Sequence, residues 1–565
     1  MSSAAQSSAA PSRSGEYSHR QILTIITGLM MGMFLGALDQ TIVSTAIRTI
    51  SDDLNGLSLQ AWVTTAYLIT STIATPIYGK LGDLYGRKKL FMFAISVFIA
   101  GSALCSFATS MYMLAAFRAV QGIGAGGLFT LVLAIIGDIV SPRERARYTG
   151  YFMATFGTSS VLGPVIGGFF ADHAVILGLT GWRWVFLVNV PIGIAALFVV
   201  YRTLHVHHER RPARIDWSGA ATLVVTLVPL LTVLEQGRDW GWTSGRSLAC
   251  FLVAAGGLAA FVAVESRMQD GALIPMRMFR VRSISVGIVA SMMVGMAMFG
   301  GIMILPLYMQ IVHGATPMQS GFLMLPMVVG MMSASIVSGQ VISRTGHIRG
   351  FPIFGSGLAA LAMLALSRVG ADTDLVLVMA LMLMIGYGLG NCMQPLLLIL
   401  QSSVAPRDIG VATASATFFR QIGGTIGVAV FVSLLFSTVG GNIHGAVADA
   451  SADPAFRSAV QQGVASHDPV ERGVAQSILH PSSHGAVAQV QDDSSFIQRL
   501  DATLAHPFKA GFAQSMDHVF LLAGLLMLLG FLVLWLMPHV ELRATSAAAA
   551  VRSEAAPTAP VTDQV

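Results

Sequence analysis

Charged side chains are scarce in this sequence: Asp, Glu, Lys and Arg make up 11% of its 565 residues, whereas a soluble domain carries about a quarter. Cysteine is almost absent, and Cys105, Cys250 and Cys392 lie apart, without the spacing of a zinc site or a disulfide framework. The phosphate-binding loop Gly-x-x-x-x-Gly-Lys-Ser/Thr, which would indicate ATP as the energy source, does not occur. We therefore expect no metal and no cofactor.

Hydrophobic residues make up 54% of the chain and gather in long runs. A helix of about 20 residues crosses about 30 Å of hydrocarbon at about 1.5 Å per residue. We expect spans near residues 22–47, 60–79, 90–108, 111–138, 148–170, 184–203, 217–236, 246–265, 283–312, 319–342, 351–369, 375–400, 410–436 and 517–537. These runs predict an all-α, polytopic protein (14 TM helices) surrounded by the lipid bilayer.

Basic residues occur mainly in one set of alternate loops between the spans. That set contains Lys80, Arg87, Lys88, Lys89, Arg143, Arg145, Arg147, Arg202, Arg210, Arg211, Arg214, Arg267, Arg277, Arg280, Arg282, Arg344, Arg349 and Arg407; the opposite short loops contain mainly Arg48, Arg183, Arg238, Arg246 and Arg368. By the positive-inside rule the first set is cytoplasmic, which places both termini in the cytoplasm. Because the net charge of +5 is not gathered on one soluble face, we expect no nucleic-acid partner.

An internal repeat relates two halves of the chain. Residues 79–89 align with residues 339–349, each with two glycines seven apart before a basic turn, and residues 122–124 align with residues 386–388. We therefore predict a cytoplasmic tail at 1–21, a six-helix bundle at 22–203, two inserted helices at 204–266, a cytoplasmic linker at 267–282, a second six-helix bundle at 283–537 and a cytoplasmic tail at 538–565. Parallel halves suit alternating access, in which two bundles rock about a site near the bilayer midplane.

Two polar segments lie between predicted spans. Residues 437–516 are expected to form a long, solvated outer loop with helical patches such as residues 454–464. His205, His207 and His208 lie in a cytoplasmic loop where no acid or thiol completes a ligand set. We expect a solvated loop there and no metal site.

The stretch at 79–89 is the strongest local signal for a gate at the cytoplasmic face. Its glycines, Gly79 and Gly86 among them, permit a tight reversal between two helices. Asp83 is expected to favour the positive N-terminal end of a neighbouring helix, one that starts near Phe351. Arg87 is expected to bond nearby acids, and Lys88 completes the basic turn. The alternative is that these charges only orient the protein.

The fifth span contains a second glycine-rich motif. Pro164 breaks an internal hydrogen bond and kinks the helix, and Gly163 and Gly167 form a face of small residues that is followed by Gly168. Another helix can therefore pack closely against it. Such a contact can belong to the exchange mechanism, or it can be a plain packing seam.

Asp39 is a carboxylate far from any predicted helix end. A buried acid is costly unless it is paired or protonated. The helical rise places Asp39 and Arg118 both about 10–12 Å below the outer surface, so they can face each other. Because burial disfavours the ionised acid and the guanidinium favours it, the proton can leave or return as access changes. We therefore predict that this pair couples transport to protons; the alternative is a static ion pair.

Other polar residues in the spans are candidates for lining a substrate cavity. They are Gln121, Gln310, Asn391, Gln394 and Arg420. Hydrogen bonding between helices is the alternative role. Methionines crowd the ninth and tenth spans, at Met292, Met293, Met296, Met298, Met303, Met309, Met324, Met327, Met331 and Met332. They suit either an adaptable cavity or a surface that faces lipid.

These motifs together resemble the major facilitator superfamily. The stretch at 79–89 is similar to the family's signature turn between the second and third helices, and residues 163–168 are similar to its antiporter motif. Residues 38–43 resemble the first-helix motif of drug:proton antiporters, and residues 118–124 resemble the fourth-helix motif with its buried arginine. Residues 182–193 are similar to the sixth-helix motif of the fourteen-spanner EmrB/QacA branch. The resemblance implies the major facilitator fold, two six-helix bundles plus two inserted helices.

The resemblance also implies a function. We expect a proton-coupled exporter (a drug:H+ antiporter) of small amphipathic organic compounds, driven by the proton gradient, monomeric, in the bacterial cytoplasmic membrane. The second half lacks a deep carboxylate, which favours neutral or zwitterionic cargo. Within transport, the alternative is a dedicated exporter of one secondary metabolite or lipid. From another class, the alternative is a non-transporting membrane sensor; an enzyme is not expected, because no catalytic constellation is apparent.

Overall fold

The computed structural model describes residues 19–54, 60–140, 142–204, 216–268, 271–315, 317–405, 408–479, 497 and 499–540. Over these residues the chain is nearly all helical, and a single two-stranded hairpin joins β1 (Val175–Ile176) to β2 (Leu179–Thr180). Most of the two predicted tails, together with His205, His207 and His208, lies outside the described residues.

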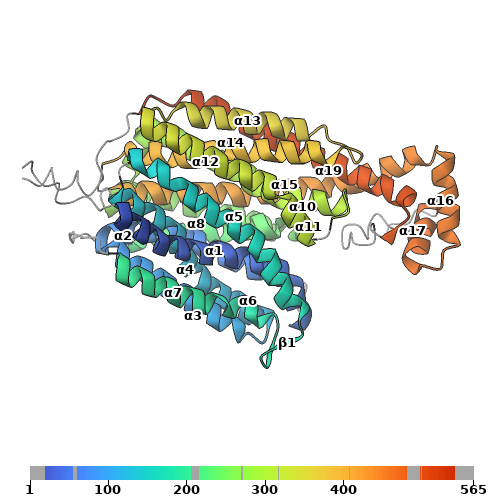
Figure 1. Ribbon diagram of the computed structural model, residues 1–565, viewed down its shortest axis with the longest axis horizontal. Coiled ribbons are helices and arrows are strands. Elements are labelled where there is room, and N and C mark those ends of the chain that lie inside the picture. Colours follow the sequence, from blue (N-terminus) through green and yellow to red (C-terminus); the bar gives the residue numbers. More distant parts are fainter. Residues whose placement is uncertain are drawn as a thin grey trace, which may run out of the picture.

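The first half of the chain forms one side of the molecule, drawn in blue to teal in Figure 1. Its helices are α1 (His19–Asp53), α2 (Gln60–Tyr85), α3 (Arg87–Ser106), α4 (Met111–Ile139), α5 (Pro142–Asp172), α6 (Arg183–Leu187) and α7 (Asn189–Thr203). α4 packs against both α2 and α3, and α1 packs against α5 and α7.

The second half forms the other side, drawn in yellow to red (Figure 1). It consists of the 3₁₀ helix η3 (Met276–Arg280), α10 (Arg282–Ile311), α11 (Pro317–Leu323), α12 (Leu325–Thr345), α13 (Gly350–Leu366), α14 (Leu375–Ser402), α15 (Ile409–Ala450) and α19 (Ala502–Trp535). The halves meet where α5 contacts α12 and where α2 contacts α15. The inserted helices α8 (Trp217–Trp240) and α9 (Gly245–Met268) pack on each other, and α8 contacts α2 and α15.

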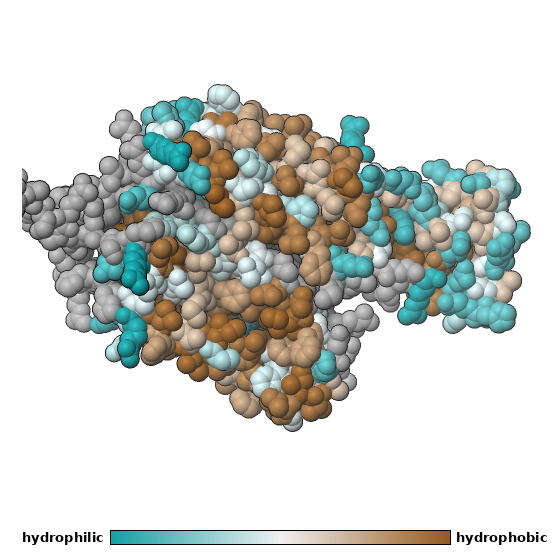
Figure 2. Space-filling view, viewed as in Figure 1, coloured by the Kyte–Doolittle hydropathy of each residue, from teal (hydrophilic) through white to brown (hydrophobic). Residues whose placement is uncertain are grey.

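Eleven of the described helical segments are long and apolar enough to cross a membrane. α2, α5 and the shorter apolar α13 pack alongside them, an arrangement consistent with the fourteen predicted spans. Figure 2 shows apolar side chains over the flank of the helical body and hydrophilic ones at its ends and on the projecting part. This distribution is expected of a polytopic protein whose flank replaces water with lipid.

Close helix packing repeats between the two halves at the aligned glycines. A Cβ on Gly122 would overlap α2, and a Cβ on Gly124 would overlap α3. In the second half, Gly386 stands against α12 and Gly388 against α13 in the same way. Each half therefore clamps its fourth helix between its second and third, as the sequence repeat predicts.

The turns that were aligned at 79–89 and 339–349 also share a backbone conformation. Gly86 has φ 95° and Gly346 has φ 74°. Side chains with a Cβ are strained in this left-handed region, so a glycine is favoured at both turns.

The segment at 437–516 was predicted as a solvated loop with helical patches, and the patch at 454–464 is confirmed as a helix. The loop assignment is wrong at both ends of the segment, which are helical. α15 continues to Ala450, and α19 begins at Ala502, well before the predicted span at 517–537. α16 (Pro454–Val464) and α17 (Pro469–Leu479) project with them from the helical body (Figure 1). Residues 480–496 and 498 lie outside the described part of the chain.

Apolar packing explains why the two helices continue beyond the predicted spans. Ile443 of α15 is buried and lies against Gly511 of α19. Asn442 Nδ2 donates a hydrogen bond to Ser515 Oγ at 2.9 Å in the same contact. Val439 and Ile443 are four residues apart, which is a helical spacing that the polar residues around them conceal.

Candidate functional site

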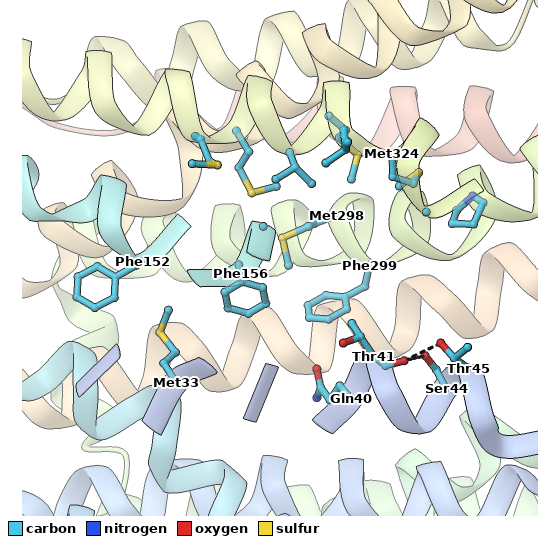
Figure 3. A pocket seen from close by; sticks show the side chains of 18 of the residues that line it. Met33, Gln40, Thr41, Ser44, Thr45, Phe152, Phe156, Met298, Phe299 and Met324 are labelled. Carbon is cyan, nitrogen blue, oxygen red and sulfur yellow. Dashed lines mark hydrogen bonds between the residues drawn. The ribbon is translucent and has the colours of Figure 1, made fainter. Parts of the chain in front are cut away.

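A cavity of about 970 Å³ lies between the two halves (Figure 3). α1, α4 and α5 line it from the first half, and α10, α11, α12, α14 and α15 line it from the second. Along α1 and α10 the lining starts near the middle of the helix and continues toward its C-terminal end, as far as Thr49 and Gln310. The cavity therefore extends toward the end of the molecule opposite to the turn after α2.

Most of the cavity wall is apolar and adaptable. Its methionines and phenylalanines are Met33, Met298, Met324, Met327, Met331, Met332, Met393, Phe129, Phe152, Phe156, Phe169 and Phe299. Figure 3 shows Met33 and Phe156 of the first half opposite Met324 of the second. Thioether chains change shape easily and aromatic rings offer large apolar faces, so such a wall can accept molecules of different outline.

The methionines of the ninth and tenth predicted spans divide between the cavity and other surroundings. Five of those named above line the cavity, namely Met298, Met324, Met327, Met331 and Met332, whereas Met292, Met293, Met296 and Met309 do not. The side chain of Met303 is outside the described part. The predicted role of these methionines as an adaptable cavity wall therefore holds for only some of them.

Three of the five predicted polar residues line this cavity: Gln310, Gln394 and Arg420. Gln121 and Asn391 do not, so the structure corrects the expectation for these two. Asn391 Nδ2 donates to Tyr387 O of its own helix at 2.8 Å. Gln121 faces the interior of the first half.

A polar edge along α1 was missed from the sequence. Gln40, Thr41, Ser44 and Thr45 line the cavity and lie together in Figure 3. Their spacing at i, i+1, i+4 and i+5 puts them on one helical face. That spacing was readable in the sequence, but nothing local shows which face meets the second half.

Asp39 and Arg118, which the sequence places at matching depth, are in direct contact. Arg118 Nη1 donates to Asp39 Oδ2 at 2.6 Å, and both side chains are buried. Gln121 Nε2 and Asn189 Nδ2 each donate to Asp39 Oδ1 at 2.8 Å. Asp39 thus accepts three hydrogen bonds, from α4 and α7, and one of them comes from the charged guanidinium.

Arg118 is also held by an aromatic ring. Its guanidinium carbon lies 4.1 Å from the centre of the Tyr67 ring, in a cation–π contact from α2. Asn189 Nδ2 additionally donates to Ser102 Oγ of α3 at 3.0 Å. Asn189 and Tyr67 were not predicted; Asn189 does lie within the sixth-helix motif at 182–193, which was the available signal.

The buried ion pair does not line the cavity. Gln40 and Thr41 of α1 face the cavity, whereas Asp39 faces the interior of the first half. In this conformation the ion pair and the cavity therefore occupy separate places. α1, which carries Asp39, and α4, which carries Arg118, each also line the cavity.

α1 packs tightly on α5 directly beside this pair. A Cβ on Gly163 would overlap Thr41, and a Cβ on Gly167 would press on the backbone of Ile42. Thr41 Oγ1 donates to Ser159 O across the seam at 3.1 Å. Gly168 has open space at its Cβ position and lines the cavity. The α5 motif, with Pro164 inside the helix, therefore fixes α1 two residues away from Asp39.

The turn at 79–89 latches the two halves together. Asp83 accepts a hydrogen bond from Arg87 Nη2 at 2.8 Å and from the backbone N–H of Val411 at 3.1 Å. Gly410 leaves room for the carboxylate, because a Cβ there would overlap it. Gly79 packs against Ala414 in the same way. The carboxylate thus binds the N-terminal end of α15 in the other half.

The helix that receives Asp83 is not the predicted one. The sequence suggested the helix that starts near Phe351, which is α13, whereas the structure uses α15. Asp138 of α4, which was not predicted as a partner, forms an ion pair with Arg87 Nη1 at 2.9 Å. Lys88 Nζ donates to Tyr201 O at 2.9 Å, within the first half.

We expect Asp83→Asn to loosen this latch. The neutral amide loses the interaction of a carboxylate with a helix N-terminus, worth about 1 kcal/mol, and weakens the bond to Arg87. Hydrogen exchange at the first amides of α15, Val411 and Ala412, should become about fivefold faster. Asp374→Asn is the matched control. Asp374 also binds a helix N-terminus, since it accepts a hydrogen bond from the backbone N–H of Val376 in α14 at 3.0 Å, but it lies away from the latch. Unchanged exchange at Val411 would show that the carboxylate does not hold the latch.

Two helical halves around a central cavity, latched at one end and apolar on the flank, define a polytopic membrane carrier. The chain belongs to the Major Facilitator Superfamily, whose family model matches residues 29–428. This confirms the family and fold that the motifs predict.

Curated relatives and solved structures agree with this assignment. The chain is 38% identical to the Multidrug transporter protein MdtP of Bacillus subtilis (strain 168), over 75% of this chain and 77% of that protein. It is 36% identical to Multidrug resistance protein 3 of the same organism, over 72% and 78% respectively. Its fold matches the proton:xylose symporter XylE with a TM-score of 0.58 at 16% identity, covering 95% of this chain and 100% of that one.

Proposed function

We propose that this protein exports small amphipathic organic compounds across the bacterial cytoplasmic membrane in exchange for protons. The observation that carries the proposal is the cavity between the halves, whose methionine and phenylalanine wall can adapt to different cargo. The names of its relatives, a multidrug transporter and a multidrug resistance protein, support export of several compounds. The protein works as a monomer with both termini in the cytoplasm.

The proton is taken up by Asp39. Its carboxylate pairs with Arg118 while α1 is packed on α5, and protonation would release Arg118 and weaken the bonds from Gln121 and Asn189. Gln40 and Thr41 follow Asp39 on α1 and line the cavity, so a shift of α1 changes the cavity directly. The proton and the cargo thus occupy separate places, and α1 links them.

The conformation described here corresponds to the outward-facing state of the transport cycle. The cavity extends toward the end where α1 and α10 finish, and the latch of Asp83 on α15 closes the opposite end. With the basic loops in the cytoplasm, the closed end is the cytoplasmic one. Opening the latch would expose the cavity to the cytoplasm for loading.

Proteoliposomes with an imposed pH gradient test this function. Two unrelated neutral amphiphiles, N-phenyl-1-naphthylamine and Nile red, should each move in the direction opposite to the protons, and addition of either should dissipate the pH gradient, as reported by an enclosed pH dye. Competition between the two separates a multidrug exporter from a dedicated one. Amphiphile binding with no movement under any gradient would instead identify a sensor and reject the proposal.

A further inference from the structure

The cavity is nearly free of charge. Among its described lining residues Arg420 alone carries an ionisable group, and no Asp or Glu is present. The remaining polar side chains are amides and hydroxyls, such as Gln40, Gln310 and Gln394. A charged group on the cargo therefore meets a single fixed charge, and that charge is positive.

Arg420 is half-buried and, among the residues that the structure describes, differs from the buried Arg87 and Arg118 in having no charged partner. Arg118 is paired with Asp39, and Arg87 with Asp83 and Asp138. Within the described part of the chain, the Arg420 guanidinium makes no ion pair and no hydrogen bond to another residue. A charge that is partly removed from water and has no partner is costly, so an arginine in this state favours an anion that enters the cavity.

The position of Arg420 is fixed by helix packing. A Cβ on Gly295 of α10 would overlap the backbone of Arg420, and the Arg420 side-chain stem passes 3.0 Å from the same point. One turn further along α15, Gly423 lies against Met292 and Gly424 against Phe299. The seam between α10 and α15 thus sets where the guanidinium stands, beside the cavity wall of Phe299 and Met298.

We propose that Arg420 binds the anionic group of the cargo and that the preferred substrates are amphipathic carboxylates or sulfonates. The planar guanidinium presents paired N–H donors that match two oxygens of such a group. The apolar body of the molecule then lies on the methionines and phenylalanines. This proposal rests on the proposed export function, because it names the chemical class of its cargo.

Anionic cargo also fits the energetics of proton exchange. A proton that enters and an anion that leaves both move charge in the direction favoured by a potential that is negative inside. For a neutral cargo only the proton contributes. Export of an anion should therefore respond more steeply to membrane potential than export of its neutral analogue.

Two dyes with one skeleton isolate the charge. 8-Anilinonaphthalene-1-sulfonate carries a sulfonate, and N-phenyl-1-naphthylamine lacks it. Binding is measured by fluorescence titration of the purified full-length protein in detergent, with protein-free micelles subtracted. Arg420→Gln should weaken binding of the sulfonate dye by about tenfold to hundredfold, which is the range for a hydrogen bond to a charged group. Binding of the neutral dye should change less than about twofold.

Two further variants complete the test. Arg420→Lys keeps the charge but not the paired donors, and we expect it to recover part of the lost affinity. Arg368→Gln is the matched control, because it removes the same charge from an exposed position outside the cavity. Equal weakening of both dyes by Arg420→Gln, or no weakening of the sulfonate dye, overturns the anion site. Failure of transport with intact, Arg420-dependent binding would reject the export function and leave the anion site standing.

Discussion

Replacing Asp39 by Asn is expected to abolish proton-linked efflux while the protein still inserts into the membrane. Asn cannot bind and release a proton, so a pH gradient should drive no more amphiphile efflux than in protein-free vesicles. The amide oxygen of the new asparagine can still accept the hydrogen bonds from Gln121 and Asn189, which keeps the local geometry. The measurement is proton flux and amphiphile flux in the same proteoliposomes.

Asp39→Asn should also reduce stability, and this effect has to be separated from the loss of coupling. The substitution leaves Arg118 buried without a counter-charge, which costs about 3–5 kcal/mol. The double variant Asp39→Asn with Arg118→Gln removes both charges, so it should recover much of the stability without recovering coupling. Asp53→Asn is the matched control, since Asp53 lies at the exposed end of the same helix. Proton-coupled efflux that persists in either variant lacking Asp39 would remove this carboxylate from the mechanism.

Gly163→Leu is expected to have the second-largest effect, a loss of both stability and transport. Even one Cβ at this position would overlap Thr41, so α1 and α5 must separate. Overpacking of this kind costs about 1–3 kcal/mol. Because Asp39 lies two residues before Thr41, the displacement should also disturb the Arg118 pair. We expect transport to fall at least tenfold, with Gly163→Ala intermediate.

The control for Gly163→Leu is Gly256→Leu in α9, where a Cβ meets open space. Melting in detergent and efflux in proteoliposomes are compared for the three variants. If Gly163→Leu melts and transports like Gly256→Leu, the α1–α5 seam is neither tight nor part of the exchange.

Much of the fold was accessible from the sequence because membrane spans are local features. A run of apolar residues of sufficient length has to cross the bilayer as a helix, whatever its neighbours are. The repeat added which helices correspond, and the glycines at 122–124 and 386–388 occupy equivalent contacts. The C-terminal end of α15 and the N-terminal end of α19 were missed because polar residues there conceal the contact between Ile443 and Gly511.

The candidate site was accessible only in part. Helical rise alone placed Asp39 level with Arg118, and the two are in contact. Asn189 comes from 150 residues further along the chain, and no local pattern relates it to Asp39. Likewise, the sequence shows that Arg420 lies in an apolar run. That its guanidinium has no ion-pair partner among the described residues is a property of the assembled cavity.

The sequence by itself determined that this protein is helical, lies in the membrane, repeats its halves and belongs to the major facilitator family, since apolar length, charge asymmetry and glycine motifs are properties of short segments. Only the tertiary structure decided that Asp83 binds α15, 328 residues away, that Asp39 faces away from the cavity, and that Arg420 faces into it. The physical reason is that each of these depends on which helix surfaces meet. The pattern along one helix shows that one of its faces carries polar or small residues. Which other helix packs against that face is fixed by the packing of the whole bundle.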